Sequence, residues 1–410
     1  MRRVVVTGMG VISPVGQTVE TFWENVKAGR HGITPISFFD TTDFKAKLAA
    51  EVKDFNPRQY MEKADILRSD RYAQLGMCAA VQAVEQSGII GAVEPERIGV
   101  YFGTGIGGIH TMMTEYEKLK TRGPRRVSAY FVPMLIANMC AGSIAIRYGC
   151  KGAAMPAVTA CASGSNAIGE AVRAIRHGYA DAMITGGAEA AVNELSVAGF
   201  INMQALTVSE DPDAASLPFD KRRGGFVIGE GGAALVLEEY EHARARGAVI
   251  YGEICGYGST CDAYHITSPA EDGSGAARAM TEAMKDAGVT PEMVDYINAH
   301  GTSTHHNDLF ETRAIHLAMG DAAEKVKISS TKSMVGHLLG AAGGVEFIAC
   351  VKSIEDQCLH GTAGYREKDE ACDLNYLVNG CEKADVDVVL SNSLGFGGHN
   401  ATLCVRKYKE

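Results

Sequence analysis

Short apolar runs alternate along the chain with amphipathic stretches. Helical patterns lie between the runs. In residues 166–177, for example, Ile168, Val172 and Ile175 share one face, and Gly178 follows as a C-terminal cap. The runs have the length of strands and cover residues 4–7, 98–102, 157–160, 182–185, 233–237, 294–299 and 386–391. Strands that alternate with helices predict an α/β protein with mainly parallel sheets.

Two stretches of the chain, 200 residues apart, are similar to each other. Residues 79–103 and 279–301 both read as a helix, a glycine, a Pro-Glu pair, a strand and a glycine-rich turn. The matching positions are Ala79, Ala83 and Gly88 with Ala279, Ala283 and Gly288, and residues 180–189 similarly match 384–395. This period is too long for a solenoid. We predict two similar α/β halves, residues 1–250 and 251–410; the alternative is a chance similarity between amphipathic βα units.

Composition narrows the class of protein. The chain has 410 residues, 46% of them hydrophobic and 21% charged, which is typical of a globular protein and excludes a disordered or fibrous one. The net charge of −10 argues against a general nucleic-acid binder, and an acidic partner would need a local basic patch. We find no apolar run that reads as a signal peptide or a membrane span, so no membrane partner is predicted.

The number and spacing of the cysteines indicate the redox state of the compartment. Eleven of them are spread from Cys78 to Cys404, and none forms a CxxC pair. This usage is typical of a reducing, cytoplasmic compartment rather than a disulfide framework.

Cys161 is the first candidate for chemistry. It lies between a predicted strand and a predicted helix, in a turn of small residues. Unpaired N–H groups and the positive end of the helix dipole favour a thiolate there. For the other ten cysteines we expect structural roles in the core.

Two histidines also follow turns. His300 comes after a predicted strand, in a turn rich in hydroxyl groups, and His337 stands at the predicted start of a Gly/Ala-rich helix. A helix N-terminus disfavours the imidazolium form, so His337 is expected to stay neutral and to donate one N–H. Glu346, predicted on the same helix, could pair with Lys332.

Two other motifs contain part of a dinucleotide-binding pattern and part of a metal-binding pattern. Residues 103–108 contain GxGxxG after a strand, but no acidic residue follows at the distance expected for a ribose contact. Metal-binding residue types occur at His300, His305, His306 and Asp308, yet their spacing matches no zinc signature. We therefore predict neither a dinucleotide site nor a metal site.

Several longer motifs are specific to one family. They are VVVTGMGVISPVG at the start, TACASGSNAIG around Cys161, PFDKRRGGFVIGEG at 218–231, NAHGTST at 298–304, STKSMVGHLLGAAGGVE at 330–346 and NSLGFGGHN at 392–400. With these motifs the whole chain resembles the β-ketoacyl-acyl-carrier-protein synthases of the synthase II type in dissociated (type II) fatty acid synthesis. The resemblance implies a thiolase-like fold of two related halves in five α-β-α-β-α layers, assembled as a cytoplasmic homodimer. It also implies the decarboxylative condensation of acyl-carrier protein with malonyl-carrier protein, which gives a 3-oxoacyl chain two carbons longer.

The resemblance also assigns residues. Cys161 matches the nucleophile, His300 and His337 match the catalytic histidines, and Lys332 and Glu346 match the family's catalytic lysine and its glutamate partner. The oxyanion hole matches the backbone N–H groups of Cys161 and Phe396, the contacts to phosphopantetheine match Thr302 and Thr304, and the acyl pocket matches Ile106 and Phe131. We expect the acyl carrier protein to dock on basic residues, namely Lys63, Arg68, Arg71, Arg125 and Arg126. The family needs no cofactor, although some relatives hold a structural monovalent cation.

This chain departs from the family at several positions around the expected pocket rim. These are His305, His306, His399, Leu394, Gly224, Gln204 and residues 360–365, and none of them is a catalytic group.

Four other functions are compatible with parts of the pattern. A type II polyketide ketosynthase shares Cys-His-His. A thiolase uses a second cysteine late in the chain, where this chain has residues 395–398, GFGG. A non-catalytic chain-length subunit typically lacks the nucleophile, and a cysteine hydrolase would need a protease signature that we do not find. The preferred chain length is not predicted.

Overall fold

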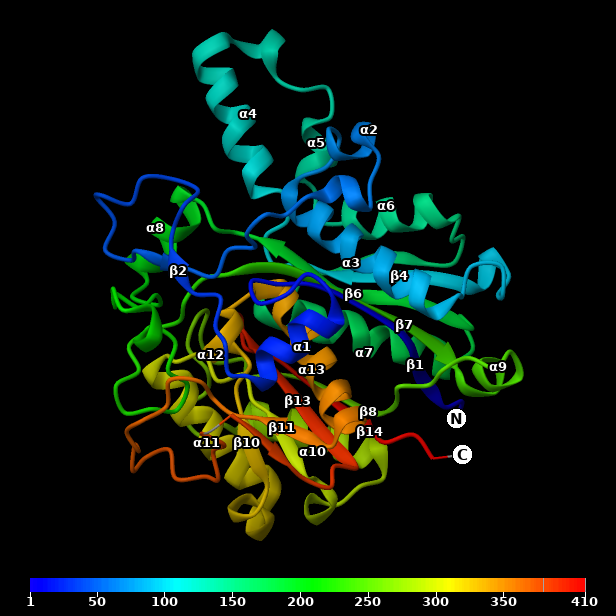
Figure 1. Cartoon of the computed structure of the whole chain (residues 1–410), viewed down its shortest axis with the longest axis vertical. Helices are drawn as coiled ribbons and strands as arrows, with labels where there is room; N and C mark the ends of the chain where they lie inside the picture. Colours follow the sequence, from blue (N-terminus) through cyan, green and yellow to red (C-terminus); the bar gives the residue numbers. More distant parts are fainter. Residues whose placement is uncertain (379, 410) are drawn as a thin grey trace.

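A ten-stranded sheet built from two five-stranded halves organises the computed structural model, which describes residues 1–378 and 380–409 (Figure 1). The first half contains β1 (Val4–Ile12), β4 (Ile98–Gly103), β5 (Ala154–Ala157), β6 (Ala182–Ala190) and β7 (Glu230–Glu239). The second contains β8 (Gly252–Cys261), β9 (Tyr296–Asn298), β10 (Lys327–Ser329), β13 (Val388–Gly395) and β14 (His399–Arg406). The halves join at β1 and β8, where Val5 pairs with Glu253 and Val6 with Gly252.

The two halves have the same topology. Their strand orders are β1-β7-β6-β4-β5 and β8-β14-β13-β9-β10. In each order the first two pairings are antiparallel and the last two are parallel. The predicted duplication of an α/β unit is therefore confirmed, whereas the expectation of mainly parallel sheets is wrong, because half of these pairings are antiparallel.

Helices form the other three layers. In Figure 1, α3 (Arg71–Ser87) covers the outer face of the first half and α10 (Ser274–Ala287) that of the second. The central layer contains α7 (Ser163–Arg176) and α13 (Ala342–Asp356), which pack against each other between the two halves of the sheet. These are the five α-β-α-β-α layers that the family resemblance implied.

Glycines set the spacing between each outer helix and its sheet. A Cβ atom on Gly10 of β1 would lie 2.0 Å from the carbonyl oxygen of Ala79, and one on Gly258 of β8 would lie 1.9 Å from that of Ala279. The absence of a side chain lets each helix backbone approach its strand. Both outer helices thus dock through the repeat positions that the sequence comparison singled out.

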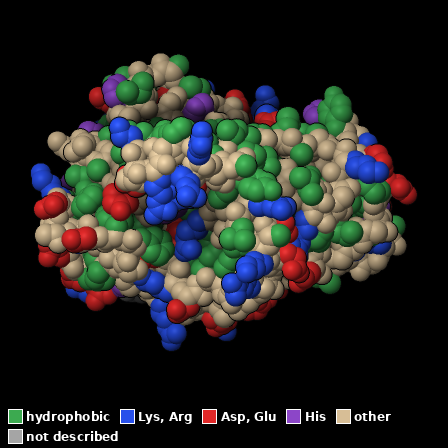
Figure 2. Space-filling model, turned by 90° about the horizontal axis from the view of Figure 1, so that it is seen from above, with side chains coloured by type: hydrophobic (Ala, Val, Ile, Leu, Met, Phe, Trp, Pro, Cys, Tyr) green, Lys and Arg blue, Asp and Glu red, His purple; other side chains and the backbone are tan. Residues whose placement is uncertain are grey.

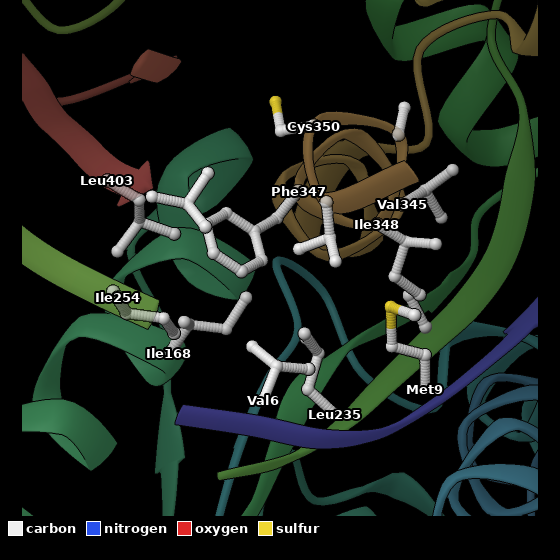
Figure 3. Packing of buried hydrophobic residues seen from close by; sticks show 14 of the residues in the cluster. Val6, Met9, Ile168, Leu235, Ile254, Val345, Phe347, Ile348, Cys350 and Leu403 are labelled. Carbon is white, nitrogen blue, oxygen red and sulfur yellow. The ribbon is translucent and has the colours of Figure 1, made fainter. Parts of the chain in front are cut away.

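The largest hydrophobic cluster lies around the central helices (Figure 3). Ile168 of α7 and Phe347 of α13 meet Leu235, Ile254 and Leu403 from both halves of the sheet, and all five side chains are fully buried. Burying a side chain of this size contributes roughly 1.5–3 kcal/mol. The hydrophobic packing of the central layer therefore stabilises the association of the two halves more than the two residue pairs between β1 and β8 do.

The remaining elements lie around this framework. The helices are α1 (Val19–Lys27), α2 (Lys63–Ile66), α4 (Ile109–Arg122), α5 (Phe131–Leu135), α6 (Met139–Tyr148), α8 (Glu194–Asn202), α9 (Tyr240–Ala245), α11 (His305–Met319) and α12 (Lys332–Val335), and the strands are β2 (Thr34–Pro35), β3 (Leu48–Ala49), β11 (Cys358–His360) and β12 (Cys381–Lys383). Figure 1 shows α4 standing out from the body of the molecule. None of the helices in the described residues combines the length and the apolar character that a membrane crossing requires.

Two expectations about local structure were wrong. The strand expected at 157–160 ends at Ala157, because residues 160–162 turn in a short 3-10 helix, η4 (Ala160–Ala162), that leads into α7. The structure also contains a disulfide bond between Cys358 and Cys381, which pairing of β11 with β12 brings to a Cα–Cα distance of 6.1 Å. The other nine cysteines are free, and Cys261 is exposed, so the core role expected for it is also wrong.

Candidate active site

The family residues meet at one cavity of about 620 Å³. Cys161 reaches it from the first half of the chain, whereas His300, His337 and Phe396 reach it from the second. The loops that carry them follow β5, β9, α12 and β13. The cavity thus lies between the two halves, and neither half contains a complete site.

A strained turn presents Cys161. Ala160, directly before it, has a φ of +51°, a left-handed conformation that costs an alanine energy. Ser163 holds this turn because its hydroxyl accepts the N–H of Thr159 at 2.9 Å and donates to the carbonyl of Ala160 at 2.7 Å. The thiol therefore has a fixed position at the cavity wall.

Burial of Cys161 disfavours the thiolate that is expected from its place before a helix. Burial raises its pKa to about 12, while Lys332 and the N–H of Phe396 act in the opposite direction. Desolvation of the charged form outweighs these contributions because the side chain is buried.

The turn of Phe396 and the turn of Cys161 are in contact, and the resemblance assigns their backbone N–H groups to the oxyanion hole. The Phe396 N–H faces the Cys161 thiol and lowers its pKa. Gly395 packs directly against the backbone N–H of Cys161. A Cβ atom on Gly395 would lie 3.2 Å from the Cys161 nitrogen and 2.7 Å from the Thr159 carbonyl oxygen. Two N–H donors beside a nucleophile are the arrangement that stabilises an oxyanion.

The two histidines lie edge to face, with ring centroids 5.3 Å apart. Nδ1 of His337 accepts the N–H of Leu339 at 3.2 Å, and Nδ1 of His300 lies 3.3 Å from Nζ of Lys332, which donates. With both Nδ1 atoms acting as acceptors, the hydrogen of each neutral ring is on Nε2. The hydrogen-bond network thus assigns two Nε2–H donors to the cavity.

Both rings are neutral. Burial lowers the pKa of His300 and of His337 well below 6.5, and the Lys332 ammonium lowers both further. The predicted pair of Lys332 with Glu346 is present and fully buried. His337 itself lies between α12 and the 3-10 helix η8 (Leu339–Ala341), not on the helix of Glu346 as expected, so burial and Lys332 keep it neutral rather than a helix N-terminus.

Sequence reasoning missed the structural role of two acidic residues on α11, Asp308 and Glu311. Glu311 accepts the backbone N–H groups of His300 and Gly301 at 2.8 and 2.7 Å, and burial raises its pKa to about 7. Asp308 accepts the N–H groups of Phe219 and Ser303. Together they hold the turn of His300, and the only sequence signal was two acidic residues closely following NAHGTST.

Most of the other assigned residues also reach the cavity. Thr302 and Thr304 line it, with their hydroxyl oxygens 2.9 Å apart, and Ile106 lines it too. Phe131 begins α5 and is not one of the lining residues. Among the departures from the family, Gln204, Gly224, His305, His306 and Leu394 line the cavity, whereas His399 pairs with Cys261 on β8.

The basic residues expected to bind the carrier fall into two groups. Arg71 makes a two-pronged ion pair with the buried Glu230, at 2.7 and 2.6 Å, so its charge is already neutralised. The guanidinium of Arg68 lies 5.0 Å from the ring centre of Tyr130. This contact brings Arg68 toward the segment between α4 and α5 that carries Arg125 and Arg126, whereas Lys63 begins α2.

The two competing motifs have other roles. The N–H groups of Gly105 and Ile106 in the GxGxxG segment donate to Glu189, so they are not free to bind a pyrophosphate. Asp308 is occupied by backbone donors. In the described part of the chain, no group of three or more His, Cys, Asp or Glu side chains could hold a metal ion.

Comparison with known proteins agrees with this geometry. The family model "Beta-ketoacyl synthase, N-terminal domain" matches residues 1–243, and "Beta-ketoacyl synthase, C-terminal domain" matches residues 251–366. The chain belongs to the β-ketoacyl synthase family. The synthase is 50% identical to 3-oxoacyl-[acyl-carrier-protein] synthase 2 of Synechocystis sp. and 48% identical to that of Staphylococcus aureus, covering 100% of this chain and 99% of each relative.

Solved structures are similar over the whole chain. A β-ketoacyl synthase from Burkholderia phymatum has a TM-score of 0.92 at 33% identity. A type II polyketide ketosynthase, in complex with its acyl-carrier protein and bound to a hexaketide, has a TM-score of 0.93 at 35% identity. In both cases all of this chain and all of the other chain are covered.

Proposed function

We propose that this synthase elongates acyl chains by two carbons, condensing acyl-carrier protein with malonyl-carrier protein to give 3-oxoacyl-carrier protein. One observation carries the proposal: two neutral histidines offer Nε2–H donors to the cavity that holds a buried thiol and two backbone N–H groups. This arrangement serves an acyl-transfer step and an enolate-forming step in the same place.

The first step transfers the acyl group to Cys161. The sulfur attacks the thioester carbonyl, and the backbone N–H groups of Cys161 and Phe396 stabilise the negative charge on its oxygen. The bond to the pantetheine sulfur then breaks, and the proton lost by the Cys161 thiol is taken up by that departing sulfur. No separate base is required, which agrees with two histidines whose Nδ1 atoms already act as acceptors.

The second step forms the new carbon–carbon bond. Malonyl-carrier protein loses CO2, and the electron pair of the broken bond forms an enolate whose oxygen accepts the Nε2–H groups of His300 and His337. The nucleophilic carbon attacks the acyl carbon on Cys161, the carbon–sulfur bond breaks, and the released thiolate takes a proton from solvent. Lys332 positions His300 by donating to its Nδ1 and is itself held by Glu346.

Labelled CO2 release from malonyl-carrier protein tests this division of roles. Cys161→Ala should form no elongated product. Cys161→Gln places an amide carbonyl where the acyl thioester would lie, so it should release CO2 and give acetyl-carrier protein without elongation. Normal chain extension by Cys161→Ala would contradict the proposal.

A type II polyketide ketosynthase is the second candidate, because one solved relative is an enzyme of this kind. The higher identity to relatives named synthase 2 favours fatty acid elongation. A thiolase is disfavoured because Cys161 is the only cysteine among the residues described around the cavity. Supplying acyl-carrier primers of increasing length and resolving the products by mass distinguishes single elongation from repeated condensation, and detects hydrolysis or inactivity.

We infer that the carrier protein docks on a basic surface formed by Lys63, Arg68, Arg125 and Arg126. Lys and Arg side chains gather around a hollow on the face shown in Figure 2, although the whole chain carries a net charge of −10. Local positive charge steers an acidic partner and makes its binding sensitive to salt. Arg71 is left out because Glu230 neutralises it.

We also infer a homodimer. β5 is an edge strand of the sheet, and it exposes Met155; Ile146, Val132 and Val158 are exposed apolar residues nearby in the sequence. An open edge with apolar side chains is a template for pairing with another chain. Sedimentation velocity should show a dimer that Met155→Glu weakens and that Val249→Glu, at another exposed apolar residue, does not; an unchanged dimer in Met155→Glu would exclude this face.

We also infer a structural monovalent cation, although no redox or organic cofactor is expected. Two buried oxygens, Glu346 Oε2 and Asn298 Oδ1, have no hydrogen-bond partner in the described residues and are its candidate ligands. Orphaned buried oxygens of this kind commonly contact an ordered water or ion. A melting temperature that is higher in potassium or sodium chloride than in choline chloride would support the ion, and equal values would exclude it.

We propose a cytoplasmic location, because nine of the eleven cysteines are free and only Cys358 and Cys381 form a disulfide bond.

A further inference from the structure

Glu189 is a buried carboxylate that the proposed reaction does not use. It lies near the end of β6, and its side chain is fully buried. Its hydrogen-bond partners in the described residues are four uncharged donors, rather than a lysine or an arginine. A buried carboxylate is costly, so its place beside the active site calls for a role.

The four donors indicate that Glu189 is ionised. Oε1 accepts the hydroxyl of Thr104 at 3.1 Å and the N–H of Ile106 at 3.2 Å. Oε2 accepts the N–H of Gly105 at 2.6 Å and the N–H of Gly340 at 3.0 Å. Three of the four partners are backbone N–H groups, which can only donate, and a charged carboxylate accepts all four hydrogen bonds at once. Burial raises the pKa of Glu189, and these hydrogen bonds oppose the rise.

The carboxylate joins two walls of the cavity. Gly105 and Ile106 follow β4 in the first half of the chain, whereas Gly340 lies in the second half, three residues after His337. The two segments touch backbone to backbone, since a Cβ atom on Gly340 would lie 2.3 Å from the Gly105 nitrogen. Gly105, Ile106 and Leu339 all line the cavity.

We propose that Glu189 is a positioning residue for the condensation: it ties the cavity wall at Gly105 and Ile106 to the turn that follows His337, and its charge restrains the Cys161 thiol. The role in turnover rests on the proposed function, whereas the effect on the thiol does not. Gly105 lies between the carboxylate and the turn of Cys161, since a Cβ atom there would lie 2.8 Å from Glu189 Oε2 and 3.5 Å from the carbonyl oxygen of Ala160. At this position the negative charge of Glu189 is one of the causes that raise the pKa of Cys161. Its removal should therefore loosen the cavity wall and at the same time make the thiol more reactive.

Glu189→Gln separates these effects from simple destabilisation. The amide keeps the shape but loses the charge and turns an N–H₂ group toward backbone donors. We expect kcat/KM for acyl-carrier substrates to fall at least about tenfold, as for a buried hydrogen-bonded charge. We also expect iodoacetamide to alkylate Cys161 faster at a fixed pH, as followed by mass spectrometry of its peptide. The matched control is Glu253→Gln, a buried carboxylate held by Arg3 and Arg406, which should leave both quantities within twofold of the wild type.

Two milder substitutions, both at Thr104, test the proposal if Glu189→Gln does not fold. Thr104→Val removes one donor to the carboxylate, and Thr104→Ser retains it. Thr104→Val should lower kcat/KM for acyl-carrier substrates, and Thr104→Ser should restore it.

The proposal is overturned if folded Glu189→Gln leaves either kcat/KM or alkylation unchanged, or if Glu253→Gln produces the same changes. It is also overturned if Thr104→Ser is as impaired as Thr104→Val. Alkylation needs no carrier substrate, so a synthase without condensing activity would refute the proposed function while the charge effect on Cys161 was still measured.

Discussion

The backbone N–H of Leu339 donates to Nδ1 of His337 at 3.2 Å, and this contact leaves the ring hydrogen on Nε2. On the Cys161→Gln background, His337→Ala should lower CO2 release from malonyl-carrier protein by about 10²-fold or more, because it removes one donor to the enolate oxygen. His300→Ala should do the same. His316→Ala, at an exposed histidine of α11, is the control. Undiminished release after loss of both catalytic histidines would refute their roles.

The pH dependence of that decarboxylation follows from the low pKa of both histidines. The active form is neutral, and it is lost only as the pH falls through pKa values well below 6.5. CO2 release by Cys161→Gln should therefore stay high as the pH falls through 6.5, where an ordinary histidine becomes charged. Glu311, with a pKa of about 7, could also change charge in this range, so the same profile is measured in Cys161→Gln combined with Glu311→Gln. A rate that halves near pH 6.5 equally in both variants would contradict neutral histidine donors of low pKa.

Loss of Glu346 should affect both stability and turnover. Glu346→Ala leaves the Lys332 charge buried without its partner, which typically costs about 3–5 kcal/mol. We expect a lower free energy of unfolding in urea and a large loss of condensation, with Cys161 still present for alkylation. Lys352→Ala, at a partly exposed lysine of α13, is the control. Normal condensation by Glu346→Ala would reject the pairing as a functional feature.

A methyl group at Gly395 should damage the oxyanion hole. Its Cβ atom would lie 2.7 Å from the Thr159 carbonyl oxygen, so the turn that carries the Phe396 N–H must move. Losing one such donor typically costs 10²–10³-fold in rate, and we expect about this loss in acyl transfer to Cys161, measured with labelled acyl-carrier protein. Gly199→Ala on α8, where a Cβ atom meets nothing within 4 Å, should be silent. Equal activity of the two variants would argue against Phe396 as a donor.

Charge reversal tests the docking surface. Arg68→Glu combined with Arg125→Glu should raise KM for the carrier substrate at low salt and weaken its salt dependence. Arg244→Glu, at an exposed arginine of α9, should not. An unchanged KM in the double variant would show that the carrier docks elsewhere.

The sequence predicted the reactive groups better than their surroundings. Cys161, His300, His337 and Lys332 lie in local motifs, and the duplication was visible because glycine and alanine recur where helix and strand backbones touch. The thiol pKa was mispredicted because local position favours a thiolate, whereas burial depends on the whole fold.

Partners that are distant in the sequence were not predictable either. Arg71 and Glu230 are 159 residues apart, and nothing local marks them as a pair. Glu189 binds Gly340 across the two halves. Cys358 and Cys381 meet because β11 pairs with β12, two strands of three residues each that no apolar run had indicated.

The joint between the halves has an evolutionary consequence. The nucleophile comes from one copy of the duplicated unit, and the groups proposed to form the enolate come from the other. Neither copy can therefore support the reaction alone, because Phe396 of the second copy faces the Cys161 thiol and Glu189 of the first copy binds the turn after His337. Gene duplication thus produced two mutually dependent modules within a single catalytic centre.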